Sequence, residues 1–110
     1  MENTIKVLVV KPCEEPHELD IENSLKALQT LVGGYIECMH PFLDDVALVC
    51  NEEGKLLMLD ANRVILSGFG DHYDVVHGTF ILVGVKNDGF TSLTPEQSVK
   101  YKALWSLDAK

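Results

Sequence analysis

Two long apolar runs predict buried β-strands near the two ends of the chain. Residues 4–11 read TIKVLVVK, and residues 75–85 form a second run with TFILV at its centre. Such runs are typical of strands covered on both faces, because neither set of alternating side chains meets water. Pro12 ends the first run, since proline has no N–H to donate to a sheet.

A first helix is predicted from the spacing of apolar residues that follows. Between Ile21 and Val32 these residues recur mostly at steps of three and four, which gives one apolar stripe over residues 21–32. Five acids within residues 14–22 would lie at the positive end of the helix dipole. Gly33, followed by a second glycine, would end the helix in a left-handed conformation.

A second helix is predicted near the end of the chain by a local capping signal. Thr94 is followed by Pro95, which suits the first helical position, and by Gln97, which completes a capping box. The expected apolar side of this helix consists of Val99, Tyr101, Leu104, Trp105 and Leu107.

The middle of the chain predicts further strands. Residues 35–40 alternate between apolar and polar, and residues 46–59 form a hairpin in which residues 51–54 make the turn. Residues 60–66 are ambiguous: Asp60 could cap a short helical turn, and the segment belongs to an irregular linker before the next strand. The order of elements predicts an α+β fold: one small domain over residues 1–110, with a mixed or antiparallel-rich sheet of about five strands and two helices.

Charge and composition exclude several classes of function. The chain has 17 acidic and 9 basic residues, a net charge of −8, and Arg63 is its one arginine. This balance argues against direct binding to DNA or RNA, which needs clustered positive charge. No apolar run approaches the roughly 18 residues of a membrane span. The three cysteines suggest no disulfide framework, so we expect a cytoplasmic protein in which Cys38 and Cys50 are buried thiols.

One segment concentrates polar chemistry at the predicted hairpin turn and just after it. Two amides, two acids and two bases fall within thirteen residues, namely Asn51, Glu52, Glu53, Lys55, Asn62 and Arg63. A guanidinium can clamp a phosphate or carboxylate, and asparagine amides can read a base or ribose edge. The alternative is a solvated turn in which Arg63 pairs with a neighbouring acid.

Catalytic and metal signatures are weaker. No nucleophile elbow, phosphate-binding loop or glycine-rich dinucleotide motif is present, so we expect no enzyme, no cofactor and no catalytic residue. The sequence around residues 71–77 holds Asp71, His72, Asp74 and His77, but their spacing matches no standard zinc pattern, and no metal is expected. Cys38 and His40 would share one strand face, which Cys50 could join in a suitable register.

Nearly the whole chain resembles a domain-of-unknown-function family of Firmicutes, their phages and conjugative elements. The signature of that family is similar to Asn-Glu-Glu-Gly-Lys-Leu at 51–56 followed by Asn-Arg at 62–63, and Gly78 and Thr79 match as well. Other matching segments are residues 21–25, 28–29, 32–37, 83–84 and 92–94. The resemblance implies no reaction; it implies a small accessory protein of mobile elements, where counter-defence roles are common.

Two hypotheses follow from the residues and the resemblance together. In the first, a non-enzymatic protein binds and sequesters a small nucleotide-like ligand in the host cell, as a homo-oligomer if the site lies between subunits. Lys55 and Arg63 would meet phosphate, Asn51 and Asn62 a base or ribose, with further contacts from Glu52, Glu53, Gly78 and Thr79. In the second, an acidic face inhibits a basic host protein that serves defence or handles DNA. That face would consist of Glu14, Glu15, Glu18, Asp20, Glu22, Asp44 and Asp45.

Overall fold

A computed structural model describes residues 3–87 and 89–108, except for the side chains of residues 72 and 73. The α+β prediction with two helices is confirmed, and the strands outnumber the expected five. In chain order the elements are β1 (Thr4–Val10), β2 (His17–Glu22), α1 (Leu25–Val32), β3 (Ile36–Met39), β4 (Val46–Asn51), β5 (Ala61–Leu66), β6 (His72–His77), β7 (Phe80–Lys86), β8 (Gly89–Thr91) and α2 (Pro95–Leu104).

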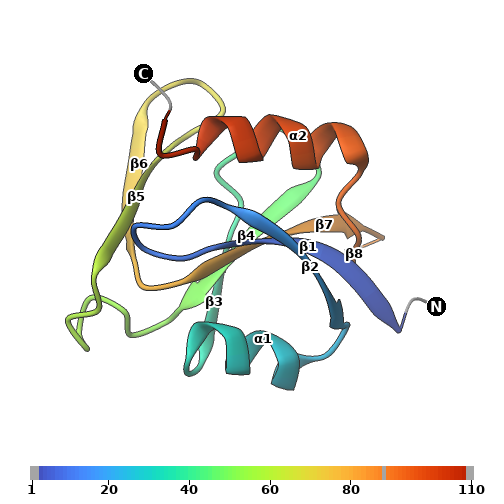
Figure 1. Cartoon of the computed structure of the whole chain (residues 1–110), viewed down its shortest axis with the longest axis horizontal. Helices are drawn as coiled ribbons and strands as arrows, with labels where there is room; N and C mark the ends of the chain where they lie inside the picture. Colours follow the sequence, from blue (N-terminus) through green and yellow to red (C-terminus); the bar gives the residue numbers. More distant parts are fainter. Residues whose placement is uncertain (1–2, 88, 109–110) are drawn as a thin grey trace.

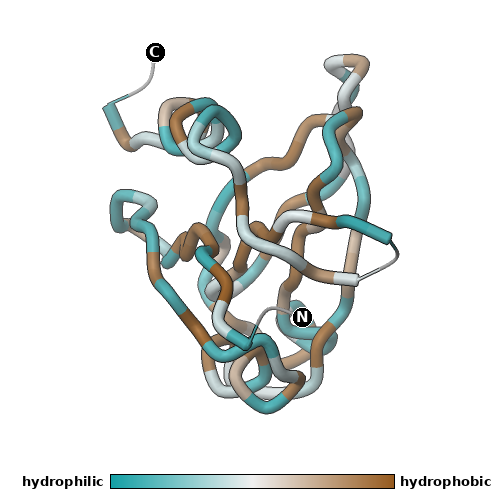
Figure 2. Tube along the Cα trace, turned by 90° about the vertical axis from the view of Figure 1, so that its right-hand side faces the viewer, coloured by the Kyte–Doolittle hydropathy of each residue, from teal (hydrophilic) through white to brown (hydrophobic). Residues whose placement is uncertain are grey.

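The main sheet is antiparallel and lies between the two helices (Figure 1). Its six strands follow the order β2-β1-β7-β4-β3, and β8 pairs with β7. A separate ribbon of β5 and β6 stands beside the sheet on the side of α2. Figure 2 shows the chain trace turned by 90°, with hydrophobic and hydrophilic stretches alternating along it.

The sheet has a hydrophobic core on each face. Leu28 and Val32 of α1 pack against one face, where alternate residues of β1 such as Val7 are completely buried. Tyr101 and Trp105 pack against the other face, together with Ile65 and Val76 of the ribbon. The prediction of a strand covered on both faces over residues 4–11 is therefore confirmed for β1.

The predicted helix over residues 21–32 is wrong in its first part. Residues 17–22 form β2, which pairs with β1 in a register that places Leu19 opposite Val7 and Ile21 opposite Ile5. Leu19 and Ile21 are two residues apart, the repeat of a strand, and this local period prevails over the longer helical one. Ser24 then caps α1, because its hydroxyl accepts a hydrogen bond from the Ala27 N–H at 3.1 Å. The expected glycine stop is confirmed at Gly33, which has φ of 81°.

The predicted hairpin over residues 46–59 is also wrong. β4 pairs with β3 and β7, and residues 52–59 form a compact turn in place of a partner strand. The ambiguous residues 61–66 are a strand, β5. The single strand expected over residues 75–85 is interrupted at Gly78, whose φ of 85° directs the chain from the ribbon back into the sheet.

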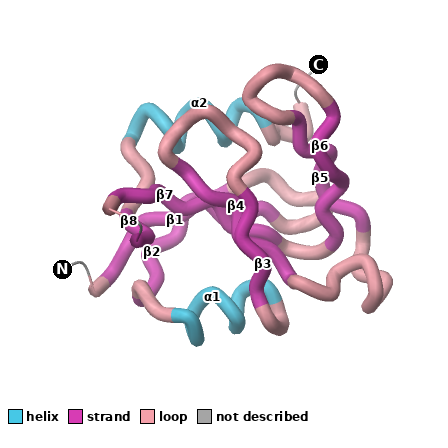
Figure 3. The backbone as a smooth tube through the Cα atoms, turned by 180° about the vertical axis from the view of Figure 1, so that it is seen from behind, coloured by secondary structure: helices cyan, strands magenta, loops and turns pink. Residues whose placement is uncertain are grey.

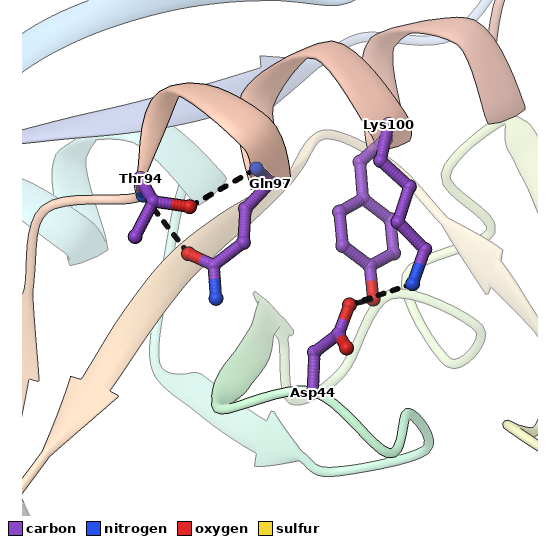
Figure 4. Close-up of polar contacts among 5 residues, drawn as sticks. Asp44, Thr94, Gln97 and Lys100 are labelled. Carbon is purple, nitrogen blue, oxygen red and sulfur yellow. Dashed lines mark hydrogen bonds and ion pairs between the residues drawn. The ribbon is translucent and has the colours of Figure 1, made fainter.

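The capping box of the second helix is confirmed (Figure 4). The Thr94 hydroxyl accepts from the Gln97 N–H at 3.1 Å, and the Gln97 side chain accepts from the Thr94 N–H at 2.9 Å. The expected apolar side of this helix is partly wrong, because Val99, Leu104 and Leu107 are exposed. Ser98, Tyr101 and Trp105 are the residues that α2 and its C-cap bury.

Candidate functional site

The structure divides the predicted polar residues into two groups. Four of them line one pocket with a volume of about 370 Å³, and these are Asn51, Glu52, Glu53 and Lys55. The other four lie at the base of the β5–β6 ribbon and at its junction with β7, and these are Asn62, Arg63, Gly78 and Thr79. Polar residues that are close in the sequence therefore belong to two different places in the fold.

The pocket lies between the edge of the main sheet and the ribbon. Glu37, Met39 and Cys50 form the wall from β3 and β4, residues 52–56 close one end, and residues 74–77 of β6 form the opposite wall. Because β3 and β4 pair with Glu37 opposite Cys50, these two side chains share the face that looks toward the ribbon.

The same register separates two cysteines that we considered together. Cys38 lies opposite Val49 and therefore faces the side of α1, away from Cys50. A cluster of Cys38, His40 and Cys50 on one face is thus ruled out. Cys38 is also exposed, so the expectation that it is buried is wrong, whereas Cys50 is buried as expected.

The pocket walls carry a net negative charge. They include four carboxylates, which are Glu37, Glu52, Glu53 and Asp74. Lys55 is the cationic side chain of the lining, and its Nζ lies 2.6 Å from Oδ1 of Asp74. Carboxylates accept hydrogen bonds but donate none, so this pocket favours ligand groups that carry N–H or O–H. The electrostatics do not favour burying a phosphate here.

His77 adds an imidazole ring to the pocket. Its Nδ1 lies 2.9 Å from the Leu59 carbonyl oxygen. Because a carbonyl can only accept, Nδ1 must carry the proton of this hydrogen bond, which leaves Nε2 as the ring nitrogen open to a ligand. The backbone therefore fixes both the ring position and the tautomer.

Cys50 cannot act as a nucleophile in this setting. Burial, together with smaller contributions from the neighbouring Glu37 and Asp74 carboxylates, raises the pKa of its thiol to about 12. Since the thiolate is the reactive form of cysteine, the thiol stays protonated near neutral pH. Cys50 therefore contributes a buried, protonated thiol to the pocket wall.

Gly54 sets the closed end of the pocket. A Cβ at this position would lie 2.6 Å from the His77 carbonyl oxygen, which is closer than any side chain can approach. The turn can therefore rest against β6 only because residue 54 is a glycine. Its role is this close approach, whereas the positive φ of the turn is found at Met58, at 60°.

Asn51 lines the pocket, but its amide is used inside the fold. The buried side chain donates from Nδ2 to the Val32 carbonyl at 3.1 Å and accepts at Oδ1 from the Glu53 N–H at 2.7 Å. It thereby joins the end of α1 to the start of the turn.

Arg63 fastens several elements together. Its Nε and Nη2 donate to the Trp105 carbonyl at 3.1 and 2.9 Å, and Nη2 also donates to the Glu14 carbonyl at 2.8 Å. Nη1 donates to Oδ1 of Asn62 at 2.8 Å, and the Asn62 amide donates in turn to the Val10 and Gly78 carbonyls. The guanidinium therefore ends on backbone oxygens from the far end of α2 and the β1–β2 turn, away from the pocket.

Several acids of the proposed acidic face also hold α2 in place. Glu18 accepts from the Ser98 hydroxyl, and Asp44 accepts from Lys100 at 2.7 Å and from the Tyr101 hydroxyl at 2.8 Å (Figure 4). These hydrogen bonds lower the pKa of both carboxyl groups. Glu15 accepts from the backbone N–H of residue 107 at 2.8 Å. Figure 3 shows how the segment between β3 and β4 reaches α2.

The alternative metal site receives no support from the described side chains. Among them, no group of three or more histidine, cysteine, aspartate and glutamate residues is arranged to hold a metal ion. The side chain of His72, which belonged to that alternative, lies outside the described residues. Within the same part of the chain, neither helix is long and apolar enough to cross a membrane.

Sequence reasoning did not place Glu37, Asp74 and His77 beside the turn, and it considered Asp74 and His77 only as part of a metal site. They are up to forty positions apart, and the pairing of β3 with β4 and the placement of the ribbon bring them together. The alternation of residues 35–40 was the available signal for Glu37, whereas no local signal marked Asp74 or His77 as neighbours of the turn.

Comparison with known proteins identifies the family but no activity. The family model described as a domain of unknown function, DUF3846, matches residues 5–106. Neither a curated protein nor a solved structure matches the chain.

Proposed function

The chain belongs to this family of unknown function, and we propose that it binds a small nucleotide-like ligand in the pocket beside β6 and sequesters it without turning it over. The observation that carries the proposal is the convergence of four residues of the polar segment on one pocket of about 370 Å³. This volume lies within the range of about 300–1,000 Å³ of small-molecule sites.

The charges of the pocket suggest how such a ligand would be oriented. The carboxylates of Glu37, Glu52 and Glu53 suit the amino groups of a base and the hydroxyl groups of a sugar, which donate hydrogen bonds. Nε2 of His77 is the ring nitrogen open to the ligand. Phosphate would stay at the rim, near Lys55, because the four acids repel it from the interior. This orientation differs from the phosphate contact at Arg63 that the sequence suggested.

Sequestration fits the pocket better than turnover does. The Cys50 thiol is held protonated, and the described residues contain no metal-binding cluster. The resemblance to accessory proteins of phages and conjugative elements motivates the further proposal that the ligand is an immune signal of the host cell. Inhibition of a basic host protein is supported less well, since Glu15, Glu18 and Asp44 are used to hold α2.

Calorimetric titration tests the proposal with nucleosides, cyclic nucleotides and ADP-ribose derivatives as ligands. We expect binding to at least one of them, and recovery of the intact ligand when the protein is denatured by heat. Glu52→Gln should weaken binding, because residue 52 is exposed and lines the pocket. Glu22→Gln on β2 is the matched control, since it removes the same charge elsewhere on the surface. Absence of binding by folded protein would reject the proposal, and a consumed ligand would replace sequestration by turnover.

A further inference from the structure

Cys50 lies at the base of the pocket, between carboxylates from two opposite walls. Its side chain is 5% exposed, and the pairing of β3 with β4 places it on the same face as Glu37. Asp74 belongs to the wall that β6 forms. After burial, these two carboxylates are the largest causes of the raised pKa of the Cys50 thiol. The base of the pocket therefore has negative charge on both sides.

The two carboxylates differ in what they already bind. Oδ1 of Asp74 accepts from Nζ of Lys55 at 2.6 Å and from the Val75 N–H at 2.8 Å. Within the described part of the chain, the Glu37 carboxylate makes no hydrogen bond or ion pair. Both of its oxygens can therefore accept hydrogen bonds from a ligand. Because Glu37 belongs to a paired strand, its position is fixed more precisely than those of the two acids on the turn.

Apolar side chains surround this carboxylate. Met39 lies two residues after Glu37 on the same strand and therefore on the same face. Val76 on the opposite wall is 3% exposed, and Leu56 lies at the closed end. A flat ring can cover such walls with its faces and still present its polar edge to a carboxylate. A flexible polyamine would instead place polar groups against apolar side chains, which is unfavourable.

We infer that the pocket selects a base with two adjacent N–H donors on one edge, as guanine has, and that Glu37 binds this edge. A carboxylate with two open oxygens accepts both donors at once, whereas an edge with a single donor leaves one oxygen without a partner. This inference rests on the proposed ligand binding and specifies the kind of base that is bound.

A matched pair of nucleotides, guanosine monophosphate and inosine monophosphate, tests the inference. They share the phosphate, the sugar, the ring N–H and the carbonyl group, and they differ in the exocyclic amino group that provides the second donor. Heteronuclear NMR titration measures both weak and tight binding. We expect guanosine monophosphate to bind about tenfold more tightly or better, because it makes one more hydrogen bond to a charged acceptor. The shifted signals should belong to residues 52–56 and 74–77.

Glu37→Gln tests the assigned residue. An amide side chain has one acceptor oxygen in place of two, so we expect the two affinities to come within about twofold of each other. Glu22→Gln on β2 is the matched control and should keep the full preference, because residue 22 is also exposed and does not line the pocket. The same spectra show whether each variant is folded.

Equal affinities of the wild-type protein for the two nucleotides would overturn the inference. A preference that survives Glu37→Gln would overturn the role of Glu37, and a preference lost in Glu22→Gln would indicate a general effect of charge. Adenosine monophosphate separates this inference from the proposed function. If it binds in the pocket more tightly than guanosine monophosphate, the inference is wrong and the proposed function stands. If no nucleoside, nucleotide or ADP-ribose derivative binds to the folded protein, both are rejected.

Discussion

Arg63 and Lys55 belong to the same polar segment of the sequence, yet the structure uses them in opposite ways. Arg63 donates to carbonyl oxygens from the α2 end and from the β1–β2 turn. Lys55 makes one ion pair, with Asp74, at the wall of an open pocket. A guanidinium that ends on backbone oxygens of distant elements fastens the fold, whereas an exposed ion pair beside a pocket can be exchanged for a ligand.

The energies of the two contacts differ in the same direction. An exposed ion pair contributes about 0–1 kcal/mol, so a ligand can replace the contact between Lys55 and Asp74 at little cost. Hydrogen bonds from a charged donor contribute about 1.5–3 kcal/mol, and removing the donor leaves its acceptors without a partner. The Arg63 side chain is therefore fixed within the fold, whereas the Lys55 side chain is available to bind a ligand.

The largest effect should come from Arg63→Met, which keeps much of the side-chain volume but removes every donor. We expect the free energy of unfolding to fall by about 2–4 kcal/mol, because the Trp105 and Glu14 carbonyls lose their charged partner. Urea denaturation measures the loss. The matched variant Lys55→Met should cost less than about 1 kcal/mol. Equal costs at the two positions would remove the distinction on which the comparison rests.

Gly54→Ala probes the boundary between the two regions. The added Cβ would lie 2.6 Å from the His77 carbonyl oxygen, so the turn or β6 must move. Overpacking of this kind costs about 1–3 kcal/mol, and we expect a loss of stability in that range together with weaker ligand binding. Gly89→Ala is the control, because a Cβ there would meet its nearest neighbour at 3.7 Å. Similar losses in both variants would mean that the close approach at Gly54 is unimportant.

The elements that could be predicted from the sequence are those whose signals are local. The capping box needs Thr94, Pro95 and Gln97, and these are neighbours in the chain. Residues 21 and 22 were misassigned to the helix because Ile21 fits the helical stripe that follows as well as the strand period, and only pairing with β1 decides between them.

The candidate site was predictable only in part, for the same physical reason. The turn residues Glu52, Glu53 and Lys55 do line the pocket. Asp74, which lies opposite them, comes from a ribbon that the sequence did not reveal. Arg63 was assigned to phosphate because guanidinium chemistry is the same for a phosphate and a carbonyl, and the partner is chosen by the fold. Side-chain type alone therefore does not distinguish a residue that stabilises the fold from one that binds a ligand.

A smaller effect of opposite sign is expected for Met58→Gly. Glycine adopts the left-handed conformation without strain, so we expect the free energy of unfolding to rise by about 0.5–1 kcal/mol. Leu57→Gly is the control and should be destabilising. Leu57 does not have a positive φ, so glycine relieves no backbone strain there and only increases the conformational entropy of the unfolded chain. The sign is read from urea midpoints. A loss of stability in Met58→Gly would show that the methionine side chain contributes more than its backbone costs.

The smallest effect is the acid sensitivity of the contact that Asp44 makes with α2. Hydrogen bonds from Lys100 and Tyr101 hold the pKa of Asp44 below the usual aspartate value of 3.8, so the unfolded chain binds the proton more readily. The stabilisation is therefore complete above pH 3.8 and is lost as the pH falls through the lower pKa of the folded state.

Urea midpoints between pH 6 and acidic pH, compared with those of Asp44→Asn, measure this contribution. The difference between wild type and variant should shrink as the solution is acidified, because the wild-type carboxylate becomes neutral like the amide. Asp45→Asn is the matched control, since it removes a carboxylate from the exposed neighbouring position and leaves the two hydrogen bonds of Asp44 in place. A constant difference at every pH would mean that Asp44 fastens α2 through geometry rather than charge. The region around α2, which Arg63 and Asp44 hold in place, would then differ from the pocket in its contacts but not in its acid sensitivity.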